Sequence, residues 1–183
     1  MAKQKASMLG IIMGLVVLAM CAMAVAGLAI DEWTVYNIDT VLGEDSVSVP
    51  FGDYSDSVIG EEGEKVEDIE ISFDTENPAA MRTVMVVFGY IAVIALCALA
   101  VLYLLKMVLN FGLMRFLVGI LGIVTLAAGA VLTGVTASYC SDFIGNAEIF
   151  GQSGELVMGV GAYLSCIGAM GGGLAAVIGV ARK

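Results

Sequence analysis

Four long apolar segments alternate with more polar ones along this chain. Each apolar run is at least as long as the ~20 residues that a helix needs to cross the ~30 Å hydrocarbon core of a membrane. We therefore predict four transmembrane helices, over residues 8–30, 83–105, 116–138 and 157–181. The fold class that follows is a membrane α-helical bundle of four spans, in a single domain that covers residues 1–183.

The polar segments between these runs differ in length. Residues 106–115 leave room only for a tight turn, so the second and third helices are expected to be antiparallel neighbours. The other two segments, 31–82 and 139–156, would both lie outside, and 139–156 is expected to be a short polar loop. Asn77 followed by Pro78 predicts a helix start, because asparagine caps helices and proline suits the first helical position.

The first apolar run also has features of a signal peptide. Lys3 and Lys5 precede it, and the small residues around Met23 would suit a signal peptidase. The run is longer than the ~7–15 residues of a signal-peptide core. We therefore expect it to be retained as a span.

The long outer segment carries a period of two. Polar and apolar residues alternate over 46–51 and over 68–73, and a third such run begins at 33–35. This alternation is typical of half-buried strands, so we predict a small extracellular antiparallel β-sheet over the helix ends. Pro50 would place its strand at an edge or end it there. The glycine- and acid-rich residues 52–63 would form a loop.

Composition and charge support a membrane protein of defined orientation. The chain is 60% hydrophobic and 14% charged, whereas a soluble domain carries roughly 45–50% apolar and about 25% charged residues. All 18 acidic residues fall in the two outer segments. The basic residues outside those segments are Lys3, Lys5, Lys106, Arg115, Arg182 and Lys183. By the positive-inside rule, we expect a multi-pass protein of the plasma membrane with both termini in the cytoplasm.

The outer carboxylates are the first candidates for binding chemistry, because Ca²⁺ takes roughly six to eight oxygen ligands. The weak cation candidates are Asp53, Asp56, Glu61, Glu62 and Glu64. Their spacing does not match the calcium-binding loop motif, so the favoured interpretation is a solvated acidic face that keeps the sheet from pairing with other chains. A ring of such loops in an oligomer would instead concentrate cations.

Groups for catalysis and proton transfer are scarce. The predicted spans contain no Asp, Glu, Lys or Arg, and the whole chain has no histidine. Pumps need ionisable groups within the membrane. We therefore expect no active transport, no enzyme activity, no cofactor and no nucleic-acid partner.

The cysteines lie in two kinds of environment. Cys21, Cys97 and Cys166 fall within spans, where cysteine acts as a small hydrophobe. They are not expected to share a depth with one another. Cys140 lies at the outer surface, where an intermolecular disulfide is the alternative to a free thiol.

Small residues repeat every four positions in the last span. One row consists of Gly161, Ser165, Ala169 and Gly173, and a second of Gly168, Gly172 and Ala176. In lipid, such rows let helix backbones approach closely. Packing within the four-helix bundle accounts for most of them, and two rows on one helix leave room for contact with a second molecule as well.

Several local features match one known superfamily. The residues concerned are Trp33 after the first span, Ala79–Arg82 at the start of the second, Ser138 and Tyr139 at the end of the third, and Glu155, Leu156, Tyr163 and the run 171–174 in or near the fourth. Together with the arrangement of spans, this pattern resembles the claudin and peripheral-myelin-protein superfamily of four-span proteins.

The resemblance implies a non-enzymatic, claudin-like membrane protein that oligomerises and makes lateral or cell-surface contacts through its acidic outer sheet. Trp33 and Tyr36 would anchor the sheet at the lipid interface, and Arg82 would pair with acid in the sheet. The Gly-Leu-Trp motif and the cysteine pair of the claudin first loop are missing here. Properties that depend on that cysteine pair are therefore not carried over.

Two alternatives stay open. The first is an accessory subunit that packs against a larger membrane complex through the small-residue faces of the first and last spans. The second is a cation-selective pore lined by the outer carboxylates. The expected partners are membrane lipid and either further copies of the chain or other membrane proteins, with cations as a further partner at the outer surface.

Overall fold

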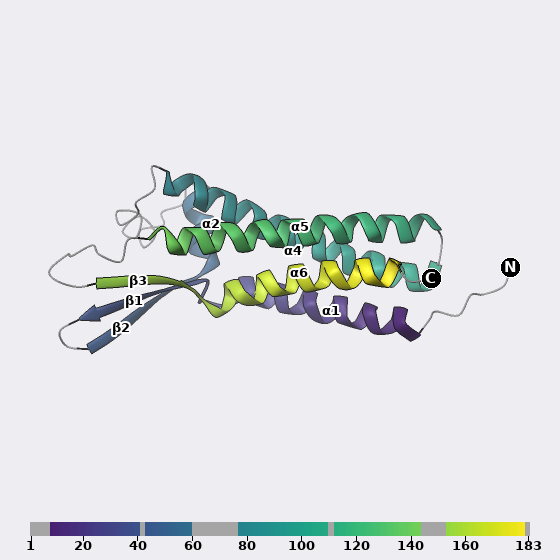
Figure 1. Ribbon diagram of the computed structural model, residues 1–183, viewed down its shortest axis with the longest axis horizontal. Coiled ribbons are helices and arrows are strands. Elements are labelled where there is room, and N and C mark those ends of the chain that lie inside the picture. Colours follow the sequence, from purple (N-terminus) through teal and green to yellow (C-terminus); the bar gives the residue numbers. More distant parts are fainter. Residues whose placement is uncertain (1–7, 41–42, 60–76, 110–111, 144–152, 182–183) are drawn as a thin grey trace.

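The computed structural model describes residues 8–40, 43–59, 77–109, 112–143 and 153–181. Within these ranges, four long helices run side by side and a small antiparallel sheet extends from one end of them (Figure 1). The long helices are α1 (Met8–Ala29), α4 (Pro78–Leu109), α5 (Gly112–Ser141) and α6 (Val160–Ala181). The other elements are the short helix α2 (Phe51–Ile59) and the strands β1 (Thr34–Thr40), β2 (Gly43–Val49) and β3 (Ser153–Met158).

All four long helices are long and apolar enough to cross a membrane, which confirms the four apolar helices predicted from the sequence. α4 begins at Pro78, upstream of the apolar run 83–105, because Asn77 caps it: the Ala80 N–H donates to Asn77 Oδ1 at 3.2 Å. Only residues 110–111 separate α4 from α5, as the predicted tight turn requires.

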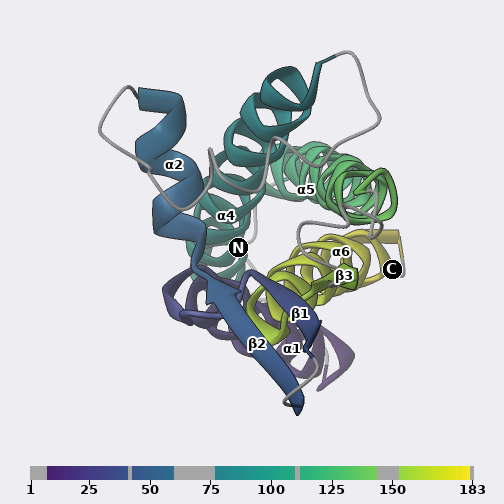
Figure 2. The ribbon, with the colours of Figure 1, turned by 90° about the vertical axis from the view of Figure 1, so that its left-hand side faces the viewer.

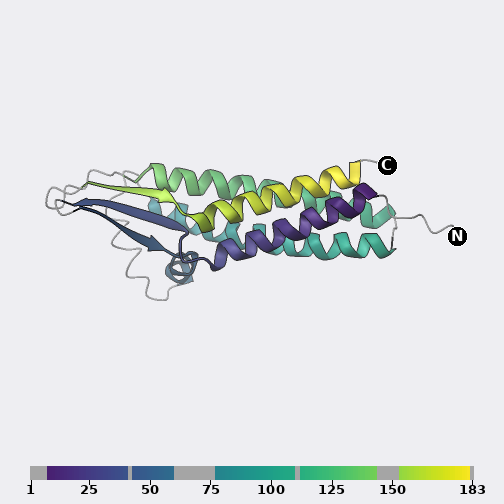
Figure 3. The same ribbon diagram turned by 90° about the horizontal axis from the view of Figure 1, so that it is seen from below.

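The four helices have unequal lengths. At roughly 1.5 Å per residue, the 32 residues of α4 and 30 of α5 span about 48 and 45 Å, while the 22 residues of α1 and of α6 span about 33 Å. The four helices end at nearly the same level opposite the sheet (Figures 1 and 3). α4 and α5 therefore project past α1 and α6 at the sheet end. The sheet stands over the two short helices, because β1 follows α1 and β3 leads into α6.

The sheet has the strand order β2-β1-β3, and both strand pairs are antiparallel. This confirms the predicted small antiparallel sheet. β2 is an edge strand that ends at Val49, directly before Pro50, as the proline predicts. The predicted strand over 68–73 lies outside the described residues.

The register gives the sheet two different faces. Asn37 pairs with Ser46 on one side and with Glu155 on the other, and all three residues are exposed. We call this row of Asn37, Ser46 and Glu155 the polar face. Thr34, three residues earlier in β1, points the other way: it pairs with Val49, and both are buried at the helix ends. Burial is not strictly alternate along the edge strand β2, because Val47, two residues before Val49, is 42% exposed.

The first outer loop predicted from the sequence contains a helix. The loop predicted for 52–63 is wrong over 52–59, and the strand predicted for 46–51 is wrong at Phe51, because Phe51–Ile59 forms α2. Phe51, Tyr54 and Val58 recur at helical spacing along one face, and the carboxylate of Asp53 in the first turn favours a helix N-terminus. The acidic and glycine-rich composition of this segment conceals that short apolar stripe.

The predicted loop over 139–156 is also wrong at both of its ends. α5 continues to Ser141, and residues from Ser153 onward form β3 along the free side of β1. The backbone groups of β1 need hydrogen-bond partners on both sides, and the segment before α6 supplies one set of them. Local sequence pattern does not show this long-range pairing.

α6 packs against α1 and α5 through its small residues. A Cβ atom on Gly168 would lie 2.7 Å from the Met20 carbonyl oxygen of α1, and one on Gly173 would lie 2.7 Å from the Gly122 carbonyl oxygen of α5. The rows predicted on this helix are thus used inside the bundle, where Gly161, Ser165, Gly168, Ala169, Gly172, Gly173 and Ala176 are all buried. They do not form a surface for a second molecule.

The outward side of α6 carries large apolar side chains instead. Its exposed residues include Tyr163, Ile167, Met170, Leu174 and Ile178. Two buried hydroxyl groups inside the bundle donate to backbone carbonyls: that of Ser165 to the Ala24 oxygen of α1 at 3.0 Å, and that of Thr136 to Leu132 of its own helix. α6 therefore has small residues at its contacts and large ones on its surface.

Two of the four cysteines meet inside the bundle. The Sγ atoms of Cys21 in α1 and Cys97 in α4 lie 3.5 Å apart, and both are free thiols. The expectation that the cysteines of the spans lie at different depths is wrong for this pair, because α1 and α4 cross at these positions. Cys140 and Cys166 are also free thiols.

Basic side chains mark the end of the bundle opposite the sheet. Lys106, in the last turn of α4, donates from Nζ to the Gly179 carbonyl oxygen near the end of α6, at 3.1 Å. Its ammonium also lies 4.5 Å from the centroid of the Tyr103 ring. A lysine that satisfies a helix C-terminus in this way is favourable both as a hydrogen-bond donor and as a positive charge.

The close approach of α6 to α1 gives a test of the packing. We expect Gly168→Ala to lower stability by about 1–3 kcal/mol, because the added methyl group forces the helices apart. Thermal unfolding in mild detergent, followed by circular dichroism, measures the loss. The matched control is Gly134→Ala on α5, where nothing lies within 4 Å of the added Cβ. Equal unfolding temperatures for the two variants would contradict this contact.

The Cys21–Cys97 pair gives a distance test of the contact between α1 and α4. A membrane-permeant thiol oxidant should join the two sulfurs with loss of two hydrogens and no change in the number of chains. Intact mass and peptide mapping measure the bond. A variant with Cys140 and Cys166 replaced by serine should form it equally well, and Cys97→Ser should not. A bond from Cys21 to Cys140 or Cys166 would show a different helix arrangement.

Candidate functional site

The chain crosses from α1 into the sheet at Glu32 and Trp33, and backbone hydrogen bonds tie three elements together there. The Trp33 N–H donates to the Val49 oxygen of β2 at 3.0 Å, while the Gly159 N–H donates to the Trp33 oxygen at 2.9 Å. The Gly161 N–H, in the first turn of α6, donates to the Glu32 oxygen at 2.9 Å. Gly159 has no room for a side chain, because a Cβ there would collide with the Glu32 carbonyl.

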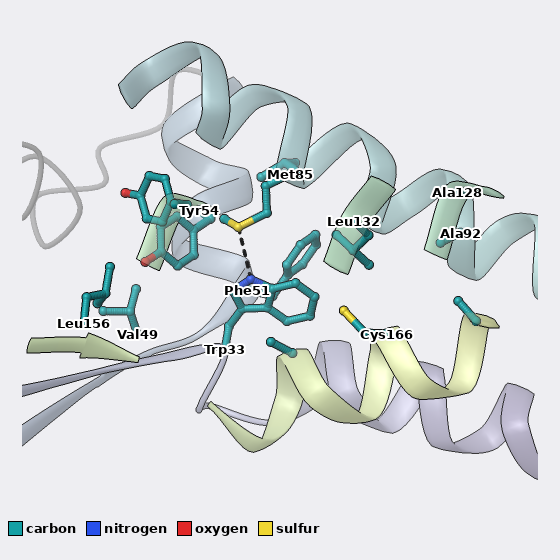
Figure 4. Close-up of a cluster of buried hydrophobic side chains, with 14 of the residues drawn as sticks. Trp33, Val49, Phe51, Tyr54, Met85, Ala92, Ala128, Leu132, Leu156 and Cys166 are labelled. Atoms are coloured by element: carbon teal, nitrogen blue, oxygen red, sulfur yellow. Dashed lines mark hydrogen bonds between the residues drawn. The ribbon is translucent and has the colours of Figure 1, made fainter. Parts of the chain in front are cut away.

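The Trp33 side chain is completely buried, at 0% exposure, between the sheet and the helix ends (Figure 4). Its indole Nε1 donates to Met85 Sδ in α4 at 3.3 Å. Its ring contacts the Phe51 ring of α2, with 4.5 Å between centroids. The prediction that Trp33 anchors the sheet at the lipid interface is therefore wrong: the residue is an internal anchor whose N–H has a protein partner.

Phe51 connects this tryptophan to the outer surface of α4. A Cβ on Gly89 would lie 2.6 Å from Phe51 Cζ, so glycine is the residue that lets the phenylalanine ring reach the helix backbone. The Phe51 ring also lies 5.4 Å from that of Tyr90 in an edge-to-face arrangement. α2 is thereby fixed against α4.

Tyr54, from the same face of α2, brings a polar contact into the junction. Its hydroxyl lies 2.7 Å from Thr34 Oγ1 in β1, and both residues are fully buried. Its ring lies 5.8 Å from the Tyr139 ring of α5, nearly perpendicular to it. We call Trp33, Phe51, Tyr54, Met85 and Tyr139 the junction cluster.

Burial dominates the electrostatics of this cluster. Desolvation raises the pKa of the Tyr54 phenol well above its ordinary value, although hydrogen bonds from Thr34 and Tyr139 and the nearby charge of Arg82 act in the opposite sense. Tyr54 therefore stays neutral at physiological pH. Arg82 lies beside the junction cluster in the first turns of α4, and its pairing with acid in the sheet stays a prediction.

Tyr36 joins the sheet to the projecting end of α5. Its ring lies 5.2 Å from the Phe143 ring, at an interplanar angle of 73°. Gly154 in β3 has no space for a side chain, because the Tyr36 ring fills it. Tyr36 is half-buried in a contact between protein elements, so the structure gives it a packing role that does not depend on lipid.

The candidate cation ligands are only partly described. Asp53 and Asp56 lie on α2, on the side away from Phe51, whereas Glu61, Glu62 and Glu64 lie outside the described residues. Among the residues that the structure does describe, no group of three or more Cys, Asp or Glu side chains is arranged to hold a metal ion.

A shallow apolar groove of about 260 Å³ lies between the outer ends of α4 and α5. Its lining residues are Ala80, Met81, Val84, Gly134, Val135 and Ser138. None of these side chains titrates, so the groove offers no acid, base or ionic nucleophile for a reaction. The arrangement as a whole holds a sheet on a bundle.

No known protein-family model matches this sequence, and no curated protein matches it either. The function proposed below therefore rests on the residues and their geometry.

The sequence identifies Trp33 but not the side chains that surround it. Phe51 ends a predicted strand and Tyr54 lies in a predicted loop, and only the spacing of Phe51, Tyr54 and Val58 indicates the helix that carries them. In the sequence, Met85 is one apolar residue among many in its helix. Its role as acceptor for the indole N–H follows from the fold alone.

Tyr54 gives a pH-dependent test of the junction cluster. Below pH ~10 the phenol is protonated in both the folded and the unfolded state. Above that pH only the unfolded state releases the proton, because the pKa is raised by burial in the folded state. The stability that Tyr54 contributes is therefore lost as the pH rises beyond the ordinary tyrosine pKa.

We expect Tyr54→Phe to lose about 0.5–1.5 kcal/mol at neutral pH, because Thr34 loses its hydrogen-bond partner. The variant should then lose less further stability than the wild type as the pH increases from ~9 to ~11. Thermal unfolding across this range measures both effects. Tyr163→Phe, on the exposed side of α6, is the matched control. If the stability of the wild type and of Tyr54→Phe fell equally between pH ~9 and ~11, the result would contradict the burial of this phenol.

Proposed function

We propose that the protein is a non-enzymatic, multi-pass membrane protein that oligomerises and makes lateral or cell-surface contacts through its outer sheet. The observation that carries the proposal is the division of roles within the sheet. One face is fixed to the bundle by the junction cluster, and the polar face of Asn37, Ser46 and Glu155 is exposed. A rigid, exposed polar surface on a membrane anchor suits recognition of a neighbour.

The distribution of apolar side chains supports membrane embedding. The exposed sides of the long helices carry large apolar residues, among them Ile94 on α4, Ile123 on α5 and Ile167 on α6. Lys106 and Arg115 lie at the end opposite the sheet, which by the positive-inside rule is the cytoplasmic end. On this proposal both termini are cytoplasmic, the sheet is extracellular and the plasma membrane is the location.

The claudin-like resemblance gains one point of support from the geometry. Trp33, Tyr139 and Leu156, three of the residues on which the resemblance depends, come from separate segments of the chain and meet in one buried cluster, beside the helix start that bears Arg82. We propose that these positions share a single role, which is to hold an outer sheet on a four-helix bundle.

The two alternatives receive less support from the geometry. An accessory subunit that docks through the small residues of α6 would need a face that is already buried in this chain. A pore through one copy would need an open axis, whereas Val17, Leu96, Leu99, Val118 and Leu132 fill the interior at 0% exposure. A cation path would therefore have to form between copies.

Measurement of the particle mass in lipid nanodiscs or mild detergent tests the proposal. We expect a defined multiple of the 19.0 kDa chain. Asn37→Arg combined with Glu155→Arg should shift the particle to a single chain, because like charges would then face each other across the contact.

The matched control is Asp56→Arg, which changes charge on α2 and leaves the polar face intact. Its particle mass should stay that of the wild type. A wild-type particle that contains one chain, or one chain with a stoichiometric foreign subunit, would overturn the proposal.

A further inference from the structure

We propose that α2 is an interfacial helix, which lies in the plane of the membrane surface and inserts its apolar end at Ile59 between the headgroups and acyl chains of the outer leaflet. The partner is a phospholipid surface. The inference rests on the membrane embedding proposed above and adds a second, lateral attachment to it.

The orientation of α2 differs from that of every long helix. In the view along the bundle, α2 is seen lengthwise as it runs outward from α4 (Figure 2). In the perpendicular view of Figure 3 it is seen nearly end-on. Its axis therefore lies across the bundle. If the long helices stand along the membrane normal, α2 is parallel to the membrane surface.

The depth of α2 matches the outer boundary of the hydrocarbon core. Phe51 contacts Gly89, and the Ser55 hydroxyl lies 2.9 Å from the Tyr90 hydroxyl. From Tyr90 to Lys106, which marks the opposite boundary, α4 rises about 24 Å at roughly 1.5 Å per residue. Because the core is ~30 Å thick, α2 lies about 6 Å below its outer limit, which is within the ~5–10 Å to which interfacial helices bury their apolar faces.

Tyr90 itself has the character of a boundary residue. Its ring is on the outward side of α4 and is 42% exposed, while its hydroxyl has a polar partner in Ser55 of α2. An aromatic ring that faces lipid with its polar tip directed toward the headgroups is typical of the interfacial belt of membrane proteins. The contact with Ser55 places α2 at that level.

The faces of α2 are arranged for this position. Phe51 and Tyr54 are buried against the bundle, and Ile59 at the end of the helix is 71% exposed. Ile59 follows Ser55 by one turn, so it continues the Phe51–Ser55 face beyond the edge of α4. Asp53 and Asp56 lie on the side of the helix away from Phe51, where Asp53 is half-buried and Asp56 is exposed. Without lipid, this isoleucine would stand in solvent at the tip of a short helix.

Charge decides which lipid surface fits. Many interfacial helices use basic residues to bind anionic lipids. α2 has Asp53 and Asp56 instead, so its attachment is apolar and anionic headgroups would repel it. A zwitterionic phosphatidylcholine surface is therefore the expected partner.

Spin labelling in phosphatidylcholine nanodiscs tests the inference. Single cysteines are placed at Ile59, at Asp53 on the opposite side of α2, and at Ile94, which is 66% exposed on α4. The native cysteines are replaced by alanine. Each labelled protein must keep the circular dichroism spectrum and the size-exclusion elution volume of the wild type. Collisions with molecular oxygen, which concentrates in lipid, are compared with collisions with a water-soluble nickel chelate.

The expected result is dominant oxygen collision at Ile59 and Ile94 and dominant nickel collision at Asp53. Nickel collision at Ile59 with oxygen collision at Ile94 would overturn the interfacial helix alone. Nickel collision at Ile94 would overturn the proposed membrane embedding. Shielding of Ile59 from both probes would show that protein covers it, which also overturns the lipid contact.

A second measurement avoids the replacement of the native cysteines. Ile59→Trp in the otherwise wild-type chain should be quenched by brominated phosphatidylcholine, with the wild-type protein as the blank because its Trp33 is buried. Asp53→Trp is the matched control and should be quenched less. Equal quenching of the two tryptophans would contradict the inserted position of Ile59.

Discussion

The burial of Trp33 is the interaction on which the outer half of the molecule depends. The Trp33 side chain contacts Phe51 of α2 and Met85 of α4. Its backbone forms hydrogen bonds with Val49 of β2 and with Gly159, which precedes α6. A tryptophan removes a large apolar area from water, and its N–H requires a partner when buried. The sheet, the short helix and the helix ends therefore form one folded unit, and the junction cluster is its core.

The sequence predicts the bundle well because lipid imposes a simple rule on it. Long runs without charge must be helices that satisfy their own backbone, and such runs are visible directly. The strands that contain Tyr36 and Val49 are also predictable, since polar and apolar residues alternate in the sequence there. α2 and β3 are not, because each depends on a distant partner: Phe51 needs the gap at Gly89, and Glu155 pairs with Asn37. The same holds for the candidate site. Trp33 can be identified from its place just after the first apolar run, whereas the roles of Tyr54 and Met85 are seen only in the folded structure.

The last helix, α6, reverses the usual distribution of side-chain size. Glycine, alanine and serine lie at the contacts of α6, and bulky apolar side chains lie on its surface. In a membrane, close backbone approach increases van der Waals contact, and the surrounding lipid accepts the large side chains. Because the small residues are used internally, the features left for recognition are the polar face of the sheet and the lateral helix α2. The proposals for function and for membrane attachment each rest on one of these two surfaces.

The unequal helix lengths have a mechanical consequence. The two short helices, α1 and α6, pass into the sheet through a few residues of continuous backbone, and their mutual contact is made by glycine and serine against main chain. Within the described residues, α4 reaches Trp33 through the Met85 side chain, and Phe143 after α5 reaches Tyr36 of the sheet. A force applied to the sheet by a neighbouring molecule would thus enter the bundle through α1 and α6, and the close backbone contact of α6 with α5 would pass it on to the α4–α5 hairpin.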